Sequence, residues 1–300
     1  MTILGITSAL WLTTCTNMVA AISFYLVYAA GMMNLSQAGF MAIGAYAIAI
    51  AAKSSVVPFW LGALLGFVVI TTVALMLAGI TARLGGIYLG MATLAFIIVI
   101  QQLIIINPHL GGAVGIHGIP RLITPASALC IVVLVSFLAR VIMKSRLGYE
   151  MRIVREDHIA AQSMGINVLV VRLQTSVLSA WIAGIAGAME ALHTNFIGPH
   201  DFGFPLLIGI LSFAIVGGTD RWWGPLIGAL LLTFLPQTTR AFRDYREIIS
   251  GALILSVMLA FPEGTVGIVL RLRSFIYKKK ALIGIRSILS MQKNEKTFKI

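Results

Sequence analysis

Long apolar stretches, divided by short polar interruptions, run from near the start of the chain to about residue 263. A helix needs about 20 residues to cross the hydrocarbon of a bilayer, and the apolar stretches repeatedly reach that length. Backbone polar groups inside lipid must be paired within the chain, so the pattern predicts an all-α, polytopic transmembrane bundle of about 8–10 spans. The expected spans lie near 9–31, 36–52, 57–80, 86–106, 123–143, 173–194, 204–219, 223–239 and 247–263.

The longest polar interruption runs from Lys144 to Arg172. Within it, the segment from Glu156 to Met164 is predicted to form one short helix. Acidic residues stand at its start, where the helix dipole favours them, and Gly165 follows as a C-terminal stop. A charged helix between two membrane spans is a place where a soluble partner can dock. The alternative is a solvated amphipathic loop.

Composition narrows the class of protein further. Hydrophobic residues make up 59% of the 300 residues and charged residues only 11%, and the mean hydropathy is +0.98. A soluble domain could not keep that much apolar surface from water. We therefore expect one transmembrane domain over residues 1–270, followed by a basic tail at 271–300.

The net charge of +12 is a possible sign of nucleic-acid binding, but its distribution favours a membrane explanation. Most of the lysine and arginine lies in the interruption at 144–172 and in the C-terminal tail, both next to membrane spans. Positive residues collect on the cytoplasmic side of membrane proteins and attract anionic lipid. We expect both regions to be cytoplasmic, in contact with membrane lipid and not with nucleic acid.

Several uncharged polar residues stand in or beside the expected spans. The run from Asn34 to Gln37 interrupts two apolar halves, which indicates either a tight turn or an unwound helix that lines a cavity. Buried polar groups cost free energy unless they find partners, so such residues either line a route for a zwitterion or bond one helix to another. The candidates for a substrate path are Asn34, Ser36, Gln37, Thr93, Gln101 and Gln102.

The span at 173–194 carries two further patterns. Glu190 and His193 lie one turn apart, and an ionisable pair inside a membrane is a candidate proton relay, although both stand near enough to the interface to reach water. Small residues at four-residue spacing let another helix approach closely, so this span should be central. The two small-residue ridges are Ala180, Gly184 and Ala188, and Ala183, Gly187 and Ala191.

Enzyme motifs are absent from the sequence. It has no GxxxxGK[ST] phosphate loop, so the chain is not expected to bind ATP, and no HExxH or CxxC cluster suggests a metal or other cofactor. Cys15 and Cys130 have no spacing partner. Energy must then come from an ion gradient or from another subunit. An ion-coupled transporter or a membrane enzyme using His193, His200 and Asp201 are the alternatives, but neither explains the polar interruption.

Six motifs in order resemble the permease subunits of bacterial ABC importers for branched-chain amino acids, of the LivM type, and the resemblance covers about residues 20–270. Together they are far more specific than any one alone. They are LSQAGFMAIGAYA at 35–47, RLGGIYLGMATLAF at 83–96, GGAVGIHGIP at 111–120, SRLGYEMRIVREDHIAAQSMGIN at 145–167, VGGTDRWWGPLIGALLLTFLP at 216–236 and FPEGTVGIV at 261–269.

The resemblance implies a division of labour. Family members pair with a second, related permease, two cytoplasmic ATP-binding subunits that hold ATP and magnesium, and a periplasmic or lipid-anchored solute-binding protein. The chain would form the path for branched-chain or related amino acids across the bacterial inner membrane. Relatives that move urea or short-chain amides are the alternative, and nothing in the sequence separates the two.

The resemblance also assigns a role to the short helix predicted after Lys144. It is similar to the coupling helix of ABC importer permeases, in which a Glu-Ala-Ala pattern is followed by a glycine. Ala160, Ala161 and Gly165 keep that spacing, but Ile159 stands where the family has glutamate. Polar contacts to the ATP-binding subunit are then expected from the neighbouring charged residues, Arg155, Glu156 and Asp157.

Overall fold

The computed structural model describes residues 2–3, 6–53, 58–219, 221–238, 251 and 255. In this part of the chain, six helical segments are long and apolar enough to cross a membrane, and two shorter apolar helices accompany them. The long segments are α1 (Ser8–Ala29), α3 (Phe59–Thr81), α4 (Gly86–Ile106), α5 (Pro125–Lys144), α8 (Val168–Thr194), and α9 (Phe204–Gly217) with the 3-10 turn η3 (Pro199–Phe202); the shorter helices are α2 (Gln37–Lys53) and α10 (Gly224–Thr238).

The expected all-α bundle is confirmed. Each of the first eight expected spans coincides with one of these helices, and the largest difference is at α8, which begins five residues before the expected 173. The expected span at 247–263 and the basic tail at 271–300 lie outside the described residues. The apolar runs therefore located the helices well, because a run long enough to cross lipid has only one backbone conformation that pairs its own polar groups.

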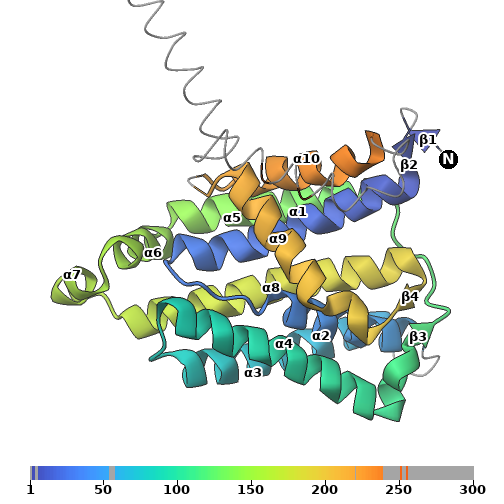
Figure 1. Cartoon of the computed structure of the whole chain (residues 1–300), viewed down its shortest axis with the longest axis horizontal. Helices are drawn as coiled ribbons and strands as arrows, with labels where there is room; N and C mark the ends of the chain where they lie inside the picture. Colours follow the sequence, from blue (N-terminus) through green and yellow to red (C-terminus); the bar gives the residue numbers. More distant parts are fainter. Residues whose placement is uncertain are drawn as a thin grey trace, which may run out of the picture.

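Helix α8 lies at the centre of the bundle, where it packs against α1, α2 and α3 (Figure 1). The small-residue ridges explain why. A Cβ atom on Gly187 would overlap the carbonyl oxygen of Met41, and one on Gly44 would overlap the carbonyl oxygen of Gly184. The backbones of α2 and α8 are therefore in direct contact, which confirms the central position predicted for the span at 173–194.

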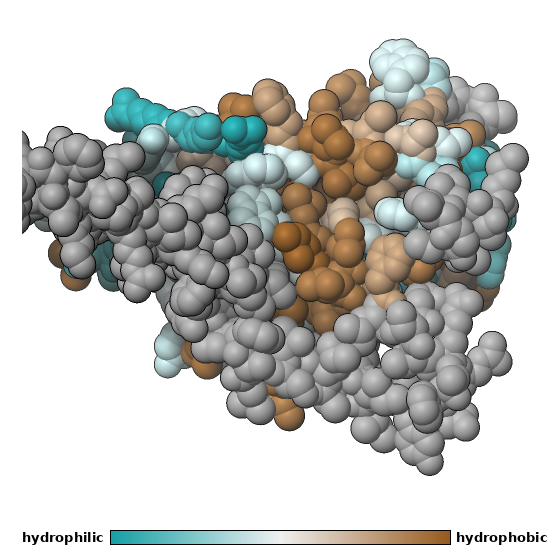
Figure 2. Space-filling view, turned by 90° about the horizontal axis from the view of Figure 1, so that it is seen from above, coloured by the Kyte–Doolittle hydropathy of each residue, from teal (hydrophilic) through white to brown (hydrophobic). Residues whose placement is uncertain are grey.

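The outer helices turn large apolar side chains outward. Leu64 on α3, Ile98 on α4 and Leu134 on α5 are each more than half exposed. Figure 2 shows one face of the molecule, on which hydrophobic residues gather in a central band with more hydrophilic residues towards both ends. A band of this kind is what a bilayer requires, so the chain is a multi-pass membrane protein.

One end of the bundle, called here the β3–β4 end, is closed by a short ladder. Strand β3 (Ile116–His117) pairs with β4 (Phe196–Ile197) in antiparallel register, and the rings of His117 and Phe196 stack 4.3 Å apart. The chain reaches β3 through two 3-10 turns, η1 (Pro108–Leu110) and η2 (Gly112–Val114). Near the chain start, two more two-residue strands pair, β1 (Thr2–Ile3) and β2 (Ile6–Thr7).

The opposite end, called here the α7 end, carries two short helices that protrude from the bundle (Figure 1). They are α6 (Arg146–Glu156) and α7 (His158–Ser163). The prediction of one short helix from Glu156 to Met164 is therefore wrong in its bounds, since Glu156 ends α6 and Asp157 separates the two helices in an extended conformation. Helix α6 lies inside the polar interruption and was not predicted.

Candidate functional site

Helix α7 is capped at both ends by hydrogen bonds with the residues that flank it. At its start, Oδ1 of Asp157 accepts the backbone N–H groups of Ile159 at 2.7 Å and Ala160 at 3.1 Å. These bonds, from Ala160 and from Ile159, hold the pKa of the Asp157 carboxyl below its ordinary value. A lowered pKa means that the cap is present above the unfolded-state pKa and is lost only in acid.

At its other end, α7 stops in a glycine turn. Gly165 has a φ of +80°, and its N–H donates to the carbonyl of Gln162 at 2.9 Å, while the N–H of Ile166 donates to the carbonyl of Ala161 at 3.0 Å. This bond pair is the Schellman arrangement, which needs a left-handed residue after the helix. Gly165 therefore acts as the predicted stop and returns the chain at once to α8.

The side chains of α7 divide into an inner and an outer set. Ala161 is fully buried within the described part of the chain, so its side chain packs inside the protein. Glu156, Asp157, Ala160 and Gly165 are exposed. Two large apolar side chains are exposed in this segment, Ile159 on the first turn of α7 at 64% and Met164 directly after the helix at 69%.

The capping role of Asp157 gives a test of α7. Asp157→Ala removes the acceptor for two N–H groups, so the first turn of α7 should loosen and its backbone amides should exchange hydrogen several-fold faster. Asp157→Asn is the matched control, because asparagine caps helices as well as aspartate. Hydrogen exchange of the purified protein, followed by mass spectrometry between pH 6 and 8, measures the effect. Equal exchange in the alanine variant would contradict it.

Arg155, the last basic residue of α6, turns back towards the bundle. Its guanidinium lies 4.8 Å from the ring centre of Tyr28 near the end of α1. The backbone of Arg155 also lies against Gly31, in the segment after α1. A Cβ atom on Gly31 would come within 2.9 Å of the Arg155 Cα atom. Gly31 has a φ of +72°, which also favours glycine. Arg155 thus joins α6 to the segment that follows α1.

That segment, residues 30–36, leads from the α7 end back into the bundle beside α8, and α2 begins inside (Figure 1). The predicted unwound polar break is therefore present. Asn34 Oδ1 accepts the N–H of Ser36 at 2.9 Å and its hydroxyl at 2.6 Å, and Thr93 Oγ1 accepts the N–H of Leu35 at 2.9 Å. Gln37 Nε2 donates to Ser179 Oγ at 3.4 Å.

These contacts define a buried polar centre made of Asn34, Ser36, Gln37 and Thr93, each no more than 5% exposed. The Oε1 atom of Gln37 is buried and has no hydrogen-bond partner among the described residues. A buried acceptor without a partner costs free energy, so this atom is available to a donor on a ligand or water. Four of the six predicted path residues are thus brought together.

Thr93 provides a test of this centre. Thr93→Val keeps the side-chain shape but leaves the N–H of Leu35 buried without its acceptor, which should lower the free energy of unfolding by about 1–3 kcal/mol. Thr93→Ser retains the hydroxyl and should cost less. Thr72→Val on α3 serves as a control, since the Thr72 hydroxyl is exposed and bonds only to its own helix. The temperature at which the purified protein loses its monodisperse peak measures the difference; equal values for all variants would refute it.

The remaining polar candidates lie elsewhere. Gln101 donates from Nε2 to the carbonyl of Pro199 at 3.0 Å, at the β3–β4 end, and Gln102 is exposed. Glu190 Oε2 and His193 Nδ1 lie 3.8 Å apart, and His193 Nε2 is 3.3 Å from Thr13 Oγ1. Gln101 bonds to η3 and His193 lies against α1, so the structure does not join these groups to the polar centre.

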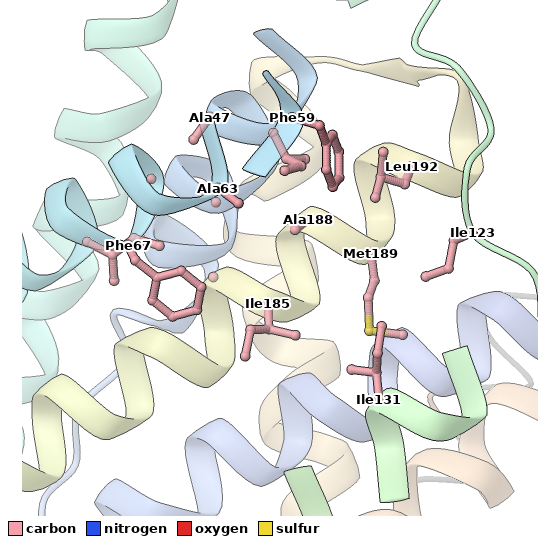
Figure 3. Close-up of a pocket in the computed structure, with 15 residues that line it drawn as sticks. Ala47, Phe59, Ala63, Phe67, Ile123, Ile131, Ile185, Ala188, Met189 and Leu192 are labelled. Carbon is pink, nitrogen blue, oxygen red and sulfur yellow. The ribbon is translucent and has the colours of Figure 1, made fainter. Parts of the chain in front are cut away.

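An apolar cavity of about 140 Å³ lies between α2, α3, α5 and α8 (Figure 3). Figure 3 shows the side chains of Phe67, Ile131, Ile185 and Met189 around it. Gly44 also contributes to its lining, two turns after Gln37 along α2. All of the lining residues are apolar, so polar residue types could not have revealed this cavity in the sequence.

A family model described as "Branched-chain amino acid transport system / permease component" matches residues 6–258. The chain belongs to this family. The resemblance based on the six motifs is thereby confirmed, and the match extends through every helix that the structure describes up to α10.

Individual relatives agree with the family. The high-affinity branched-chain amino acid transport system permease protein LivM of Salmonella typhimurium strain LT2 is 27% identical over 269 residues, covering 78% of this chain and 63% of that protein. LivM of Escherichia coli K12 is 26% identical with the same coverage. LivH of Escherichia coli K12 is 31% identical over 141 residues, or 45% of this chain and 46% of LivH. The chain therefore spans about 63% of the length of its LivM relatives.

Among solved structures, PsaBC from Streptococcus pneumoniae in complex with Fab aligns with a TM-score of 0.48 at 14% sequence identity. The alignment covers 89% of this chain and 94% of that chain.

Two features of the candidate site were not predicted from the sequence. The exposed pair Ile159 and Met164 was not singled out, although large apolar residues in a charged segment outside the spans are a signal for a docking surface. The inward turn of Arg155 towards Tyr28 had no signal in the sequence, because the two residues are more than a hundred positions apart. Ile159 lies on α7, Met164 directly follows that helix, and Arg155 lies on α6.

Proposed function

We propose that this chain is a transmembrane permease subunit of an ATP-driven importer and forms the path for branched-chain or related amino acids across the bacterial inner membrane. The match of residues 6–258 to the permease family carries this proposal. The protruding α7 supports the ATP-driven part, because a multi-pass bundle without a phosphate loop needs a surface through which a separate ATPase can act on it.

The proposed partners follow from this role. Two ATP-binding subunits, with ATP and magnesium bound to them, would grip the α7 end on the cytoplasmic side, with Ile159 and Met164 as apolar contacts and Glu156 as a polar one. A second permease would complete the path, and the identity with LivH over 141 residues supports a partner of related sequence. A periplasmic or lipid-anchored binding protein would deliver the solute at the β3–β4 end.

The contacts of Arg155 suggest how a push on α7 reaches the path. Arg155 touches Tyr28 and Gly31, and the chain from Gly31 leads directly to the polar centre at the start of α2. A displacement of α6 would therefore move residues 30–36 without passing through a regular helix, whose hydrogen bonds resist deformation. In this proposal the unpaired Oε1 of Gln37 becomes a contact for the solute when the path opens.

The cavity in Figure 3 fits the proposed solute class. Apolar cavities of about 150 Å³ can hold a ligand the size of benzene, so the 140 Å³ between α2, α3, α5 and α8 is large enough for a branched aliphatic side chain. We propose that the amino acid contacts these two places in turn as it moves along the path, the polar centre through its zwitterionic part and the cavity through its side chain. Urea has no apolar group for it, and a short-chain amide has only a small alkyl group.

Reconstitution tests the function directly. The chain, a sister permease and the two ATP-binding subunits are placed in proteoliposomes with the solute-binding protein, and uptake of labelled leucine and urea is measured. We expect leucine to accumulate with ATP and not with a proton or sodium gradient alone. Accumulation of urea instead would assign the amide-transporting alternative, and gradient-driven leucine uptake without the ATPases would refute the proposal.

A further inference from the structure

A pocket of about 460 Å³ opens at the α7 end, where the last turn of α3 meets α7 and the first turns of α8. We call it the basic pocket. It is separate from the polar centre and from the cavity of Figure 3, and no residue lines both the basic pocket and that cavity. Its lining includes Gly79, Arg83, His158, Leu169, Arg172 and Leu173.

Positive charge dominates this pocket. Arg83, Arg172 and His158 contribute to the lining, and no carboxylate does. Neither arginine forms an ion pair within the part of the chain that the structure describes. Arg172 Nη1 donates to the carbonyl of Ala82 at 3.4 Å, while its Nε is buried and has no partner among the described residues. A buried charged donor without an acceptor is costly, so an anion in the pocket would remove a penalty.

The first turn of α8 adds donors to the same place. Asn167 accepts the N–H groups of Val170 through its side chain and of Val171 through its carbonyl, at 3.3 Å and 3.1 Å. The N–H groups of Val168 and Leu169 have no hydrogen-bond partner among the described residues, and both residues line the pocket. Free N–H groups at the positive end of a 27-residue helix favour a negatively charged ligand.

The other side of the pocket is apolar and continuous with the outer surface of the bundle. Gly79 faces open space, and its neighbours on α3, Met76 and Ile80, are 63% and 75% exposed. Leu169 on α8 is 47% exposed. The pocket thus joins anion-binding groups to a surface that faces acyl chains, which is the pattern that an amphiphile with a negative head requires.

We propose that the basic pocket binds the phosphate headgroup of an anionic phospholipid, with Arg83 and Arg172 on the phosphate and the acyl chains along Leu169 and Leu173. Basic pockets between membrane helices at the positively charged side hold such headgroups. Because α3, α7 and α8 all contribute, the bound lipid fastens the base of α7 to two membrane spans. This binding does not depend on which solute the chain transports.

Native mass spectrometry of the purified full chain, co-expressed with its partner subunits, tests the proposal. The protein is titrated with phosphatidylglycerol, with phosphatidylcholine, or with inorganic phosphate. Phosphatidylglycerol should bind at concentrations where phosphatidylcholine does not. An arginine near an anionic lipid surface contributes about fivefold in affinity, so combining Arg83→Gln with Arg172→Gln should weaken phosphatidylglycerol binding about 25-fold. Arg140→Gln, an exposed arginine near the same end of α5, should leave it unchanged.

A steric variant makes the test independent of the arginine substitutions. Gly79→Phe fills the pocket without changing its charge, and it should weaken phosphatidylglycerol binding by a similar factor. Binding that is equal in wild type and in both pocket variants would overturn the proposal. Displacement of the lipid by inorganic phosphate at the same concentrations would overturn it in favour of a soluble anion. Loss of the ATP-binding subunits without loss of lipid would assign the arginines to a protein partner instead.

Discussion

Gly165→Pro is expected to reduce ATP-driven uptake to background while the protein stays in the membrane. Gly165 has a φ of +80°, and proline is fixed near −65° and has no N–H for the carbonyl of Gln162. Forcing a non-glycine residue into such a conformation costs about 1–3 kcal/mol, and proline cannot adopt it at all. The end of α7 must therefore move, and we expect the ATP-binding subunits to bind at least about tenfold more weakly.

Gly165→Asn is the matched control for this substitution. Asparagine tolerates the left-handed conformation better than other side chains and keeps the N–H, so the turn after α7 should persist. Co-purification of the ATP-binding subunits and uptake by proteoliposomes should be close to wild type in this variant. Normal uptake by Gly165→Pro, or equal loss in both variants, would show that the turn does not position α7 for its partner.

Gly187→Ala is expected to give the largest loss of stability from a single methyl group. The added Cβ would overlap the carbonyl oxygen of Met41, and because that atom belongs to the backbone of α2, no side chain can move aside. Overpacking a well-packed interior costs typically 1–3 kcal/mol, and here we expect about 3 kcal/mol or more. Thermal unfolding of the purified protein, followed by its monodisperse fraction, measures the change.

Gly209→Ala on α9 provides the comparison. A Cβ atom there would make only an ordinary contact, 3.9 Å from the ring of Phe213. Alanine also favours helix over glycine by about 1 kcal/mol, so this variant should be as stable as wild type or slightly more so. If Gly187→Ala proved equally stable, the direct backbone contact between α2 and α8 would be wrong.

Sequence pattern predicted the membrane helices well because length and apolarity decide them. It failed in the polar interruption, where α6 and α7 are too short for apolar length to define them and where local hydrogen bonds set their bounds. Asp157 ends one helix and caps the next, so the acidic residues that suggested one start at Glu156 mark a boundary inside the segment. The two hydrogen bonds that the Asp157 side chain accepts place the start of α7 at His158 and not at Glu156.

The sequence indicated which residue types belong to the candidate site, but not which of their side chains are buried and which are exposed. The resemblance to coupling helices selected both Ala160 and Ala161, but only packing decides that Ala161 is buried and Ala160 is exposed. Polarity identified Asn34, Ser36, Gln37 and Thr93 because buried polar groups are rare in lipid. It equally selected Gln101 and Gln102, since their separation from the polar centre depends on how α4 lies against its neighbours.

The β3–β4 ladder has a mechanical consequence. It ties the loop before α5 to the loop after α8, and Lys53 Nζ, at the end of α2, adds a bond to the carbonyl of His117 at 3.3 Å. With this end held, any tilt of α8 would pivot about the ladder, and a 27-residue helix is about 40 Å long. A tilt of about 5° would carry its far tip about 3.5 Å, so a small rotation at the ladder becomes a displacement of several ångströms at the α7 end.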